Sequence, residues 1–267
     1  LQALRAGKGR GGRRQSQAAV AALTAVTLAT EVGAGCVQAV PRFADSPAGP
    51  ALCVTDGECS AAVEAVRARL SLHPELSVAV DLEGMLGGPH SHVSLVQLAV
   101  DPASAGENQL VYVFDTHSNR GILGATGANS LRQLLESVTV VKVFHHCRGD
   151  ASALYHEYGI RTTNIFDTGV ADCVLMGRAY NGARGLSTVL TCWLGNEVVH
   201  LTYKAKLVHV PRMFEVQPLP LHLFVYAYED VVYCNRLYLA QRAALRSRGL
   251  TELCFALSKS RAPPRSL

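Results

Sequence analysis

Apolar and polar positions divide the chain into a weakly patterned start and a strongly patterned remainder. Residues 1–50 are rich in Ala, Gly, Arg and Pro and end in FADSPAGP, a composition typical of a tail and linker. From Ala51 the pattern sharpens, and ALCVTD predicts a short strand. A helix is predicted from Asp56 to about Leu72, because four apolar residues recur at helical spacing (Ala62, Val63, Val66 and Leu70).

Three apolar runs follow, joined by short links rich in Gly, Pro and Asn. They are Leu76–Leu82, Val93–Val100 and Leu110–Phe114. The first is almost continuously apolar, as expected for a central strand buried on both faces. The short links predict consecutive strands connected as hairpins.

The second half of the chain changes rhythm. A helix capped near Ser130 is followed by a strand at Val138–Phe144 and a helix from Asp150 that stops at Gly159. Beyond these we expect a short extended segment at Asn164–Phe166, helices at about 168–178 and 185–195, and one long helix at about Leu221–Arg246. Consecutive strands followed by alternating helices and strands predict a mixed β-sheet flanked by α-helices, in the α/β or α+β class.

Length and charge refine this picture. The chain has 267 residues, enough for one sizeable domain or two small ones. We expect a tail at 1–50, one domain at 51–247 and a basic C-terminal tail at 248–267. The net charge of +4 is concentrated at the start: residues 1–16 hold five basic residues and no acid, so the rest carries 20 basic and 21 acidic groups. A nucleic-acid partner would therefore need a local basic patch or a metal site.

Cysteine spacing favours an intracellular protein, in the cytoplasm or nucleus, with reduced thiols. None of the eight cysteines lies in a C-x-x-C pair, and zinc-ribbon spacing is absent. The apolar stretch at 17–30 follows basic residues, so organelle targeting stays open, although an alanine-rich helix or lead-in is favoured. The stretch is too short to predict a membrane span.

Two carboxylates stand at the end of the most apolar strand. Asp81 and Glu83 are two residues apart, so both project from one face. Like charges held close together favour a bound cation, and oxygen ligands suit Mg²⁺ or Mn²⁺. The alternative is a pair of exposed acids at a strand end.

Three further side chains belong to the same chemistry. Asp150 follows the strand that ends at Phe144 by six residues, although it could simply cap the next helix. Tyr226 and Asp230 lie four residues apart on one helical face, where a tyrosine could also be a packed aromatic.

These residues carry a resemblance. The order of D-x-E (Asp81-Leu-Glu83), KVFHHCRGD ending in Asp150, and Y-x-x-x-D (Tyr226 to Asp230) resembles the motifs of the DEDDy 3′–5′ exonucleases, the group of RNase D and the Werner exonuclease domain. The similarity runs from about Ala51 to Arg246. Within the group, HHCRGDASALYHEYGIRTTNIFDTGVAD looks most similar to the Egalitarian-like exonuclease 3′–5′ domain-containing proteins. His146 departs from the family pattern, in which an acid is common, and this puts substrate contacts in doubt.

The resemblance implies an RNase H-like fold and a phosphodiester hydrolase with two Mg²⁺ or Mn²⁺ ions. Asp81 would bridge the ions, Glu83 and Asp230 would hold the ion of the attacking water, and Asp150 would support the second ion. Tyr226 would orient the water. The products would be nucleoside 5′-monophosphates released from the 3′ end of single-stranded RNA or DNA, with RNA favoured.

Substrate contacts are predicted less sharply. Leu82 and Met85 could wedge against the terminal base, and His145 and Arg148 lie within the second motif. Other candidates for contact with the nucleic-acid backbone are Lys142, Lys204, Lys206 and Arg212, although for any one of them a solvated surface charge is favoured. Asp115 and Asp167 are not expected in the site, and Asp167 is expected to cap a helix.

A second interpretation stays open. The same fold and groove could serve a catalytically silent RNA-binding or scaffold module, because metal positions also need support from surrounding residues that motifs do not show. The basic tails could bind protein partners.

Overall fold

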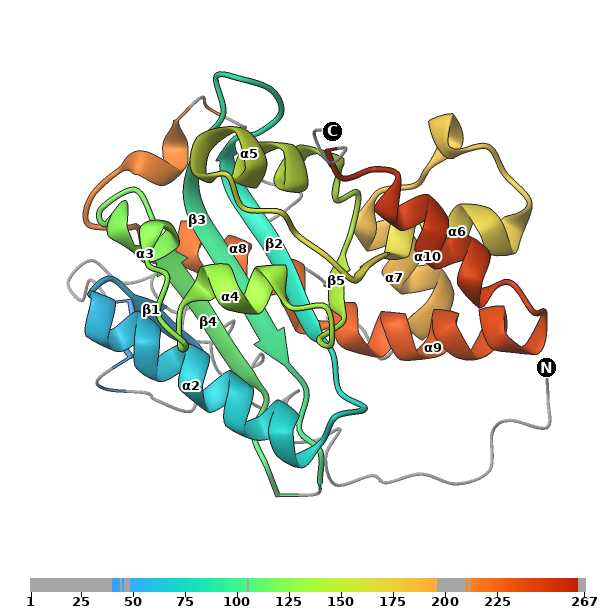
Figure 1. Cartoon of the computed structure of the whole chain (residues 1–267), viewed down its shortest axis with the longest axis horizontal. Coiled ribbons are helices and arrows are strands. Elements are labelled where there is room, and N and C mark those ends of the chain that lie inside the picture. Colours follow the sequence, from blue (N-terminus) through green and yellow to red (C-terminus); the bar gives the residue numbers. More distant parts are fainter. Residues whose placement is uncertain are drawn as a thin grey trace, which may run out of the picture.

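The computed structural model describes residues 40–43, 45, 49–104, 106–195, 210 and 212–263. The expectations for residues 1–39, Lys204 and Lys206 lie outside this part of the chain. Within it, six strands form one sheet in the order β1-β4-β3-β2-β5-β6 (Figure 1). The predicted mixed sheet is therefore confirmed.

The central strands are antiparallel and the outer strands are parallel to their neighbours. The strands are β1 (Ala51–Cys53), β2 (Val78–Met85), β3 (His92–Val100), β4 (Leu110–Asp115), β5 (Lys142–Phe144) and β6 (Ile165–Asp167). β2, β3 and β4 pair antiparallel, whereas β1 joins β4, β5 joins β2 and β6 joins β5 in parallel. β5 is shorter than predicted because the residues before it form a turn, whose carbonyls at Ser137 and Val140 accept hydrogen bonds from Lys142 Nζ.

Helices cover both faces of the sheet (Figure 1). α2 (Asp56–Leu72), α3 (Gly121–Gly124), α4 (Leu131–Glu136) and α5 (Arg148–Tyr158) enclose one hydrophobic core. On the other face lie α6 (Thr168–Met176), α7 (Leu186–Leu194), α8 (Leu221–Val232), α9 (Cys234–Ser247) and α10 (Thr251–Lys259), with the short 3-10 helices η1 (Tyr180–Gly182) and η3 (Met213–Glu215). Helix ends follow local chemistry: Thr55 and Glu58 form a capping box at the start of α2, and Gly159 ends α5 at φ 67°.

The long helix predicted at Leu221–Arg246 is wrong, because it consists of two helices. Tyr233, at φ −103° and ψ −6°, separates α8 from α9. Its φ lies well outside the usual helical value of about −63°. The break lets α8 cross β2, β3 and β4 while α9 packs on α6 and α7. The buried Tyr233 continues the apolar pattern, so the pattern shows no interruption.

The C-terminal segment differs from the expected tail. α10 packs against β6 and α6, and Cys254 is fully buried there. Ser258 Oγ accepts a 3.0 Å hydrogen bond from the backbone N–H of Asp167, and Arg248 Nη1 donates to the carbonyl of Leu175 at 2.8 Å. The folded unit therefore continues past residue 247 to at least Lys259.

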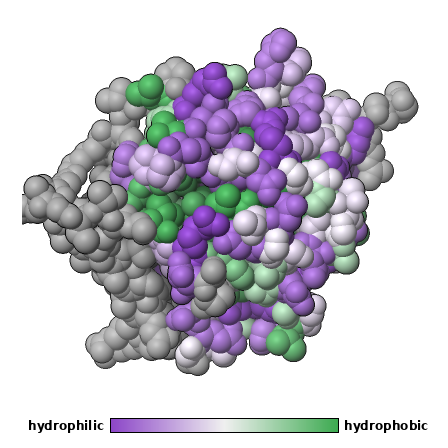
Figure 2. All heavy atoms as spheres, turned by 90° about the vertical axis from the view of Figure 1, so that its left-hand side faces the viewer, coloured by the Kyte–Doolittle hydropathy of each residue, from purple (hydrophilic) through white to green (hydrophobic). Residues whose placement is uncertain are grey.

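The outer surface is mixed in character. Figure 2 shows one side of the molecule, on which polar residues cover most of the area and apolar residues gather in a smaller central part. Among the helices that the structure describes, none combines the length and apolar character needed to cross a membrane.

Candidate active site

Asp81 and Glu83 leave β2 on the same face, as their spacing predicts. Asp81 pairs with Gln97 and Glu83 with Leu95 on β3, and the register shifts immediately afterwards. Gly84 lies at φ +142°, where an added Cβ would meet His92 O at 2.1 Å. The bulge therefore requires glycine, and it ends regular pairing directly after the two acids.

α8 brings a third carboxylate to this pair. Carboxylate oxygens of Asp81, Glu83 and Asp230 all lie within 4.8 Å of one another. Glu83 is 8% exposed and Asp230 5% exposed, so the group is largely shielded from water. Tyr226, one turn before Asp230, has its ring 5.8 Å from that of Phe214 in η3. The helical face predicted from the Y-x-x-x-D spacing is thus directed at the D-x-E pair.

Asp150 enters from the other side of β2. It lies in the first turn of α5 and is buried, and the backbone N–H of Leu82 donates a hydrogen bond to its carboxylate. Burial, followed by the negative charge of Asp81, raises the pKa of Asp150 well above its usual value. Asp81 is therefore the acid of the Asp81–Glu83–Asp230 group whose charge acts on Asp150.

This donor set fits divalent cations. Several buried carboxylates that converge on one point repel one another unless positive charge is supplied, and oxygen-only ligands suit Mg²⁺ or Mn²⁺. Burial, together with the charges of Glu83 and Asp81, raises the pKa of Tyr226 to about 12. Its hydroxyl consequently keeps its proton at neutral pH and can donate a hydrogen bond.

Gln97 is a residue that the sequence analysis missed. It is fully buried opposite Asp81, and neither atom of its amide has a hydrogen-bond partner among the described residues. Buried polar groups are usually paired, so an unpaired amide beside a carboxylate cluster points to a role in that site. The available signal was a glutamine inside a mostly apolar strand.

Two predicted contacts are corrected by burial. Leu82 is 3% exposed and packs in the core on the face of β2 opposite to Asp81 and Glu83, so it cannot wedge against a base. Lys142 is fully buried, and its Nζ donates to the carbonyls of Ser137 and Val140. It is therefore unavailable to a phosphate.

The remaining candidates differ in accessibility. Met85 is 47% exposed and Arg148, at the start of α5, is also exposed. His145 is half-buried, with Nδ1 2.8 Å from Thr168 Oγ1 and Nε2 3.0 Å from the Arg184 carbonyl, so both ring nitrogens already have protein partners. Arg212 forms an ion pair with Glu215.

The two excluded acids have structural partners. Asp167 accepts hydrogen bonds from four backbone N–H groups, those of His146, Cys147, Gly169 and Val170. It therefore caps α6, as predicted. Asp115 accepts from Ser118 and from Gln217 Nε2.

A groove lies away from these acids. It has a volume of about 1230 Å³ and is lined by residues of the β6 region and α10, among them Arg161, Asn164, Phe255 and Lys259. No acid of the candidate site lines it. Groove volume alone therefore does not mark the chemistry of this fold.

Comparison with known proteins agrees with this geometry. A family model described as 3′–5′ exonuclease matches residues 57–245, well over half of the 267 residues. The chain therefore belongs to the 3′–5′ exonuclease family.

Two relatives indicate which branch of the exonuclease family the chain resembles. The piRNA biogenesis protein EXD1 of Mus musculus is 34% identical over 106 residues, which are 39% of this chain and 17% of that protein. The Egalitarian protein homolog of Caenorhabditis elegans is 39% identical over 69 residues, 26% of this chain and 12% of that protein. The resemblance to the Egalitarian-like branch is confirmed, while the chain matches less than a fifth of either relative's length.

A solved structure supports the fold. Escherichia coli RNase D, described as an exoribonuclease involved in structured RNA processing, has a TM-score of 0.58 and 20% identity, covering 79% of this chain and 49% of that chain. At this identity the likeness concerns the fold, and it confirms the RNase H-like class.

Proposed function

We propose that the domain is a metal-dependent exonuclease that hydrolyses single-stranded nucleic acid from its 3′ end and releases nucleoside 5′-monophosphates. The observation that carries the proposal is the convergence of Asp81, Glu83 and Asp230, whose carboxylate oxygens lie within 4.8 Å of one another. Family membership supports the reaction class. RNA is favoured over DNA because one relative is named for piRNA biogenesis and a protein of similar fold is described as an exoribonuclease.

Each acid has a distinct place in this mechanism. Two divalent cations, Mg²⁺ or Mn²⁺, would supply the positive charge that lets a phosphodiester accept a nucleophile. Asp81 lies with Glu83 and Asp230, and its charge also acts on Asp150, so it is suited to contribute to both cation sites. Glu83 and Asp230 would complete one site, and Asp150 the other.

Tyr226 is assigned to positioning a water molecule. Its pKa, raised to about 12 by burial and by the charges of Glu83 and Asp81, leaves the hydroxyl protonated at neutral pH. A protonated hydroxyl can hold a water in line with the phosphorus but cannot take its proton. The exposed Met85 and Arg148 are the accessible candidates for contact with the terminal nucleotide.

The test uses a single-stranded RNA and a DNA of matching sequence, each labelled at its 5′ end. Each is incubated with the full chain and Mn²⁺, Mg²⁺ or EDTA. We expect a ladder that shortens from the 3′ end with metal, faster on RNA, and that is absent with EDTA and with Asp81→Ala. Glu64→Ala, an exposed acid on α2, is the matched control and should cleave normally.

The same experiment distinguishes the exonuclease from the second interpretation, a catalytically silent RNA-binding or scaffold module. If the wild type binds RNA but leaves it intact with either metal, the enzyme proposal fails and the domain is an RNA-binding or scaffold module. If DNA is shortened faster than RNA, the exonuclease stands and the RNA preference fails.

A further inference from the structure

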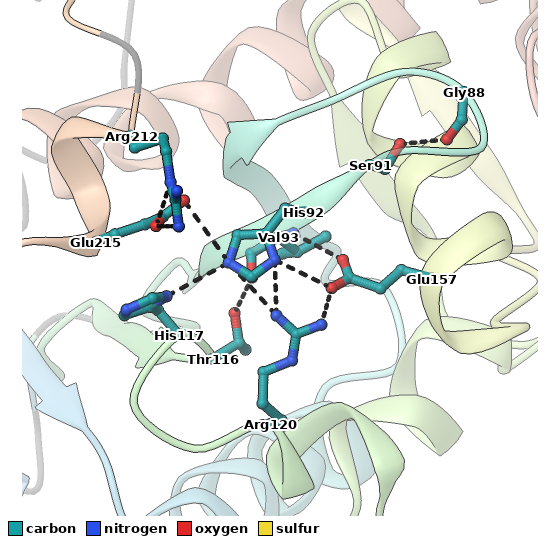
Figure 3. A network of polar contacts seen from close by, with 10 residues as sticks. All are labelled: Gly88, Ser91, His92, Val93, Thr116, His117, Arg120, Glu157, Arg212 and Glu215. Carbon is teal, nitrogen blue, oxygen red and sulfur yellow. Dashed lines mark hydrogen bonds and ion pairs between the residues drawn. The ribbon is translucent and has the colours of Figure 1, made fainter.

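A second group of metal-ligating side chains lies outside the carboxylate cluster. His92 begins β3, His117 follows β4, and Glu215 belongs to η3 (Figure 3). Each offers one ligand atom, and the three atoms lie within 4.8 Å of one another. All three residues are partly buried, and they come from segments far apart in the sequence. The cluster therefore depends on the fold.

The spacing of these atoms matches zinc coordination. His92 Nε2 lies 3.3 Å from His117 Nδ1 and 3.7 Å from Glu215 Oε1. Two ligands at 2.0–2.1 Å from a tetrahedral zinc ion lie about 3.3 Å apart. Closer approach of Glu215 to the two histidines would complete three protein ligands, with the fourth position left to water.

Neighbouring groups orient the two histidines. Glu157 Oε1 lies 3.5 Å from His92 Nδ1, and its other oxygen accepts a 2.7 Å hydrogen bond from the Val93 backbone N–H. A carboxylate that accepts a hydrogen bond from Nδ1–H leaves the Nε2 lone pair for the metal. The backbone N–H of His117 donates to the Ser94 carbonyl at 3.0 Å, which fixes that histidine to β3.

Two arginines neutralise the acids in the structure as it stands. Arg120 pairs with Glu157, and Arg212 Nε lies 2.7 Å from Glu215. Their side chains are 47% and 67% exposed, so both can turn to solvent when a cation takes their place. Arg120 Nη1 is 2.7 and 3.4 Å from the two ring nitrogens of His92, so this guanidinium has to turn away before a cation binds at Nε2.

We propose that His92, His117 and Glu215 bind a zinc ion. Imidazole ligands favour zinc-type cations over Mg²⁺, which distinguishes this site from the all-carboxylate site. The ion would link the start of β3 to η3, because His92 and Glu215 would both coordinate it. Because Glu215 adjoins Phe214, whose ring packs beside Tyr226, a bound ion would also steady the segment that leads into α8. The site does not depend on the proposed nuclease activity.

The experiment is a titration of metal-free full-length protein with Co²⁺, a spectroscopic substitute for zinc. Visible absorption reports tetrahedral coordination, and Zn²⁺ competition reports affinity. We expect one absorbing Co²⁺ in the wild type and also in Asp81→Asn, in which the carboxylate site is impaired. His117→Ala and His92→Gln should lose the band, and Glu157→Gln should weaken Zn²⁺ binding about 10- to 100-fold. His90→Ala, at an exposed histidine, should bind normally.

Several outcomes would overturn the proposal. These are a wild type without the band, a band that survives in both His117→Ala and His92→Gln, or equal loss in His90→Ala. Circular dichroism of each variant establishes that it is folded, and His92→Gln keeps a polar side chain should His117→Ala unfold. Because Asp81→Asn is tested in parallel, failure of this site and failure of the nuclease proposal give different results.

Discussion

Gln97 on β3 lies directly opposite Asp81 on β2, on the same face of the sheet. The Gln97 carboxamide is buried and has no hydrogen-bond partner among the described residues, whereas Asp81 is a candidate metal ligand. An unpaired buried amide costs about 1–3 kcal/mol. We predict that Gln97→Leu keeps or raises the melting temperature while it weakens Mn²⁺-dependent cleavage about 10-fold or more, as expected for a residue that orients a ligand.

Gln241→Leu provides the control for this prediction. Gln241 is also fully buried, but its Nε2 donates to the Thr168 carbonyl at 3.0 Å, so its loss should lower the melting temperature. Cleavage and thermal unfolding of both variants are measured together. Unchanged metal-dependent cleavage in Gln97→Leu would leave Gln97 without a role in the site.

Removal of the Tyr226 hydroxyl should slow turnover without loss of metal. We predict that Tyr226→Phe lowers kcat about 100-fold, the size of effect expected when a positioning contact is lost. Because the role assigned to the Tyr226 hydroxyl is to hold a water and not to take its proton, the pH–rate profile between pH 7 and 9 should keep its shape in the variant. Tyr228→Phe, at a buried neighbour, is the control. If the wild-type rate rises with pH and this rise disappears in Tyr226→Phe, Tyr226 would instead be identified as a base.

Replacement of Asp167 should lower the stability of the fold and affect cleavage only indirectly. Its fully buried carboxylate accepts four backbone hydrogen bonds of 2.9 to 3.2 Å. Asp167→Ala leaves these donors unpaired, and we expect a loss of about 3 kcal/mol in the free energy of unfolding. Urea denaturation of this variant and of the exposed Asp45→Ala measures the difference. Equal stability of the two variants would contradict the capping role.

Lys142 should make stability depend on pH. Burial lowers the pKa of Lys142 to about 7, from 10.5. Between these values the unfolded chain holds a proton that the folded chain has released, so the free energy of unfolding should rise with pH in that window. Lys142→Met removes this rise, and its advantage over the wild type should be greatest below pH 7 and shrink by a few kcal/mol towards pH 10.

Urea denaturation at pH 6.5, 8 and 9.5 measures this effect. Lys259→Met, at an exposed lysine on α10, should leave the pH dependence unchanged. A Lys142→Met curve parallel to that of the wild type would show that the buried ammonium is not desolvated.

Local spacing in the sequence was sufficient to predict which side chains share a face within a single strand or helix. Alternation along β2 places Asp81 and Glu83 on one face, and the four-residue step places Tyr226 above Asp230, as the structure shows. The same alternation argues against Leu82 as a substrate contact, because the residue between two inward-facing acids must point away from them. That inference was available from the sequence alone.

Other features depend on contacts that no local pattern records. The break at Tyr233 leaves the apolar pattern intact, because a buried residue can end one helix and begin the next. Lys142 is buried because a turn supplies carbonyls at Ser137 and Val140. The cluster of His92, His117 and Glu215 joins three segments that only the folded chain brings together.

The docking of α10 sets a limit on how far this protein can be shortened. Phe255 packs edge-on to Phe166, with ring centroids 5.5 Å apart, and Ser258 holds the backbone N–H of Asp167. A fragment cut after residue 247, where the recognisable motifs have ended, would expose Phe166 at the last strand of the sheet to water and to other chains. Such a fragment would retain every acid of the candidate site yet be prone to aggregate. If such a fragment were inactive, the cause would be the loss of the helix that covers Phe166. The result would not show whether the acids of the candidate site can catalyse hydrolysis.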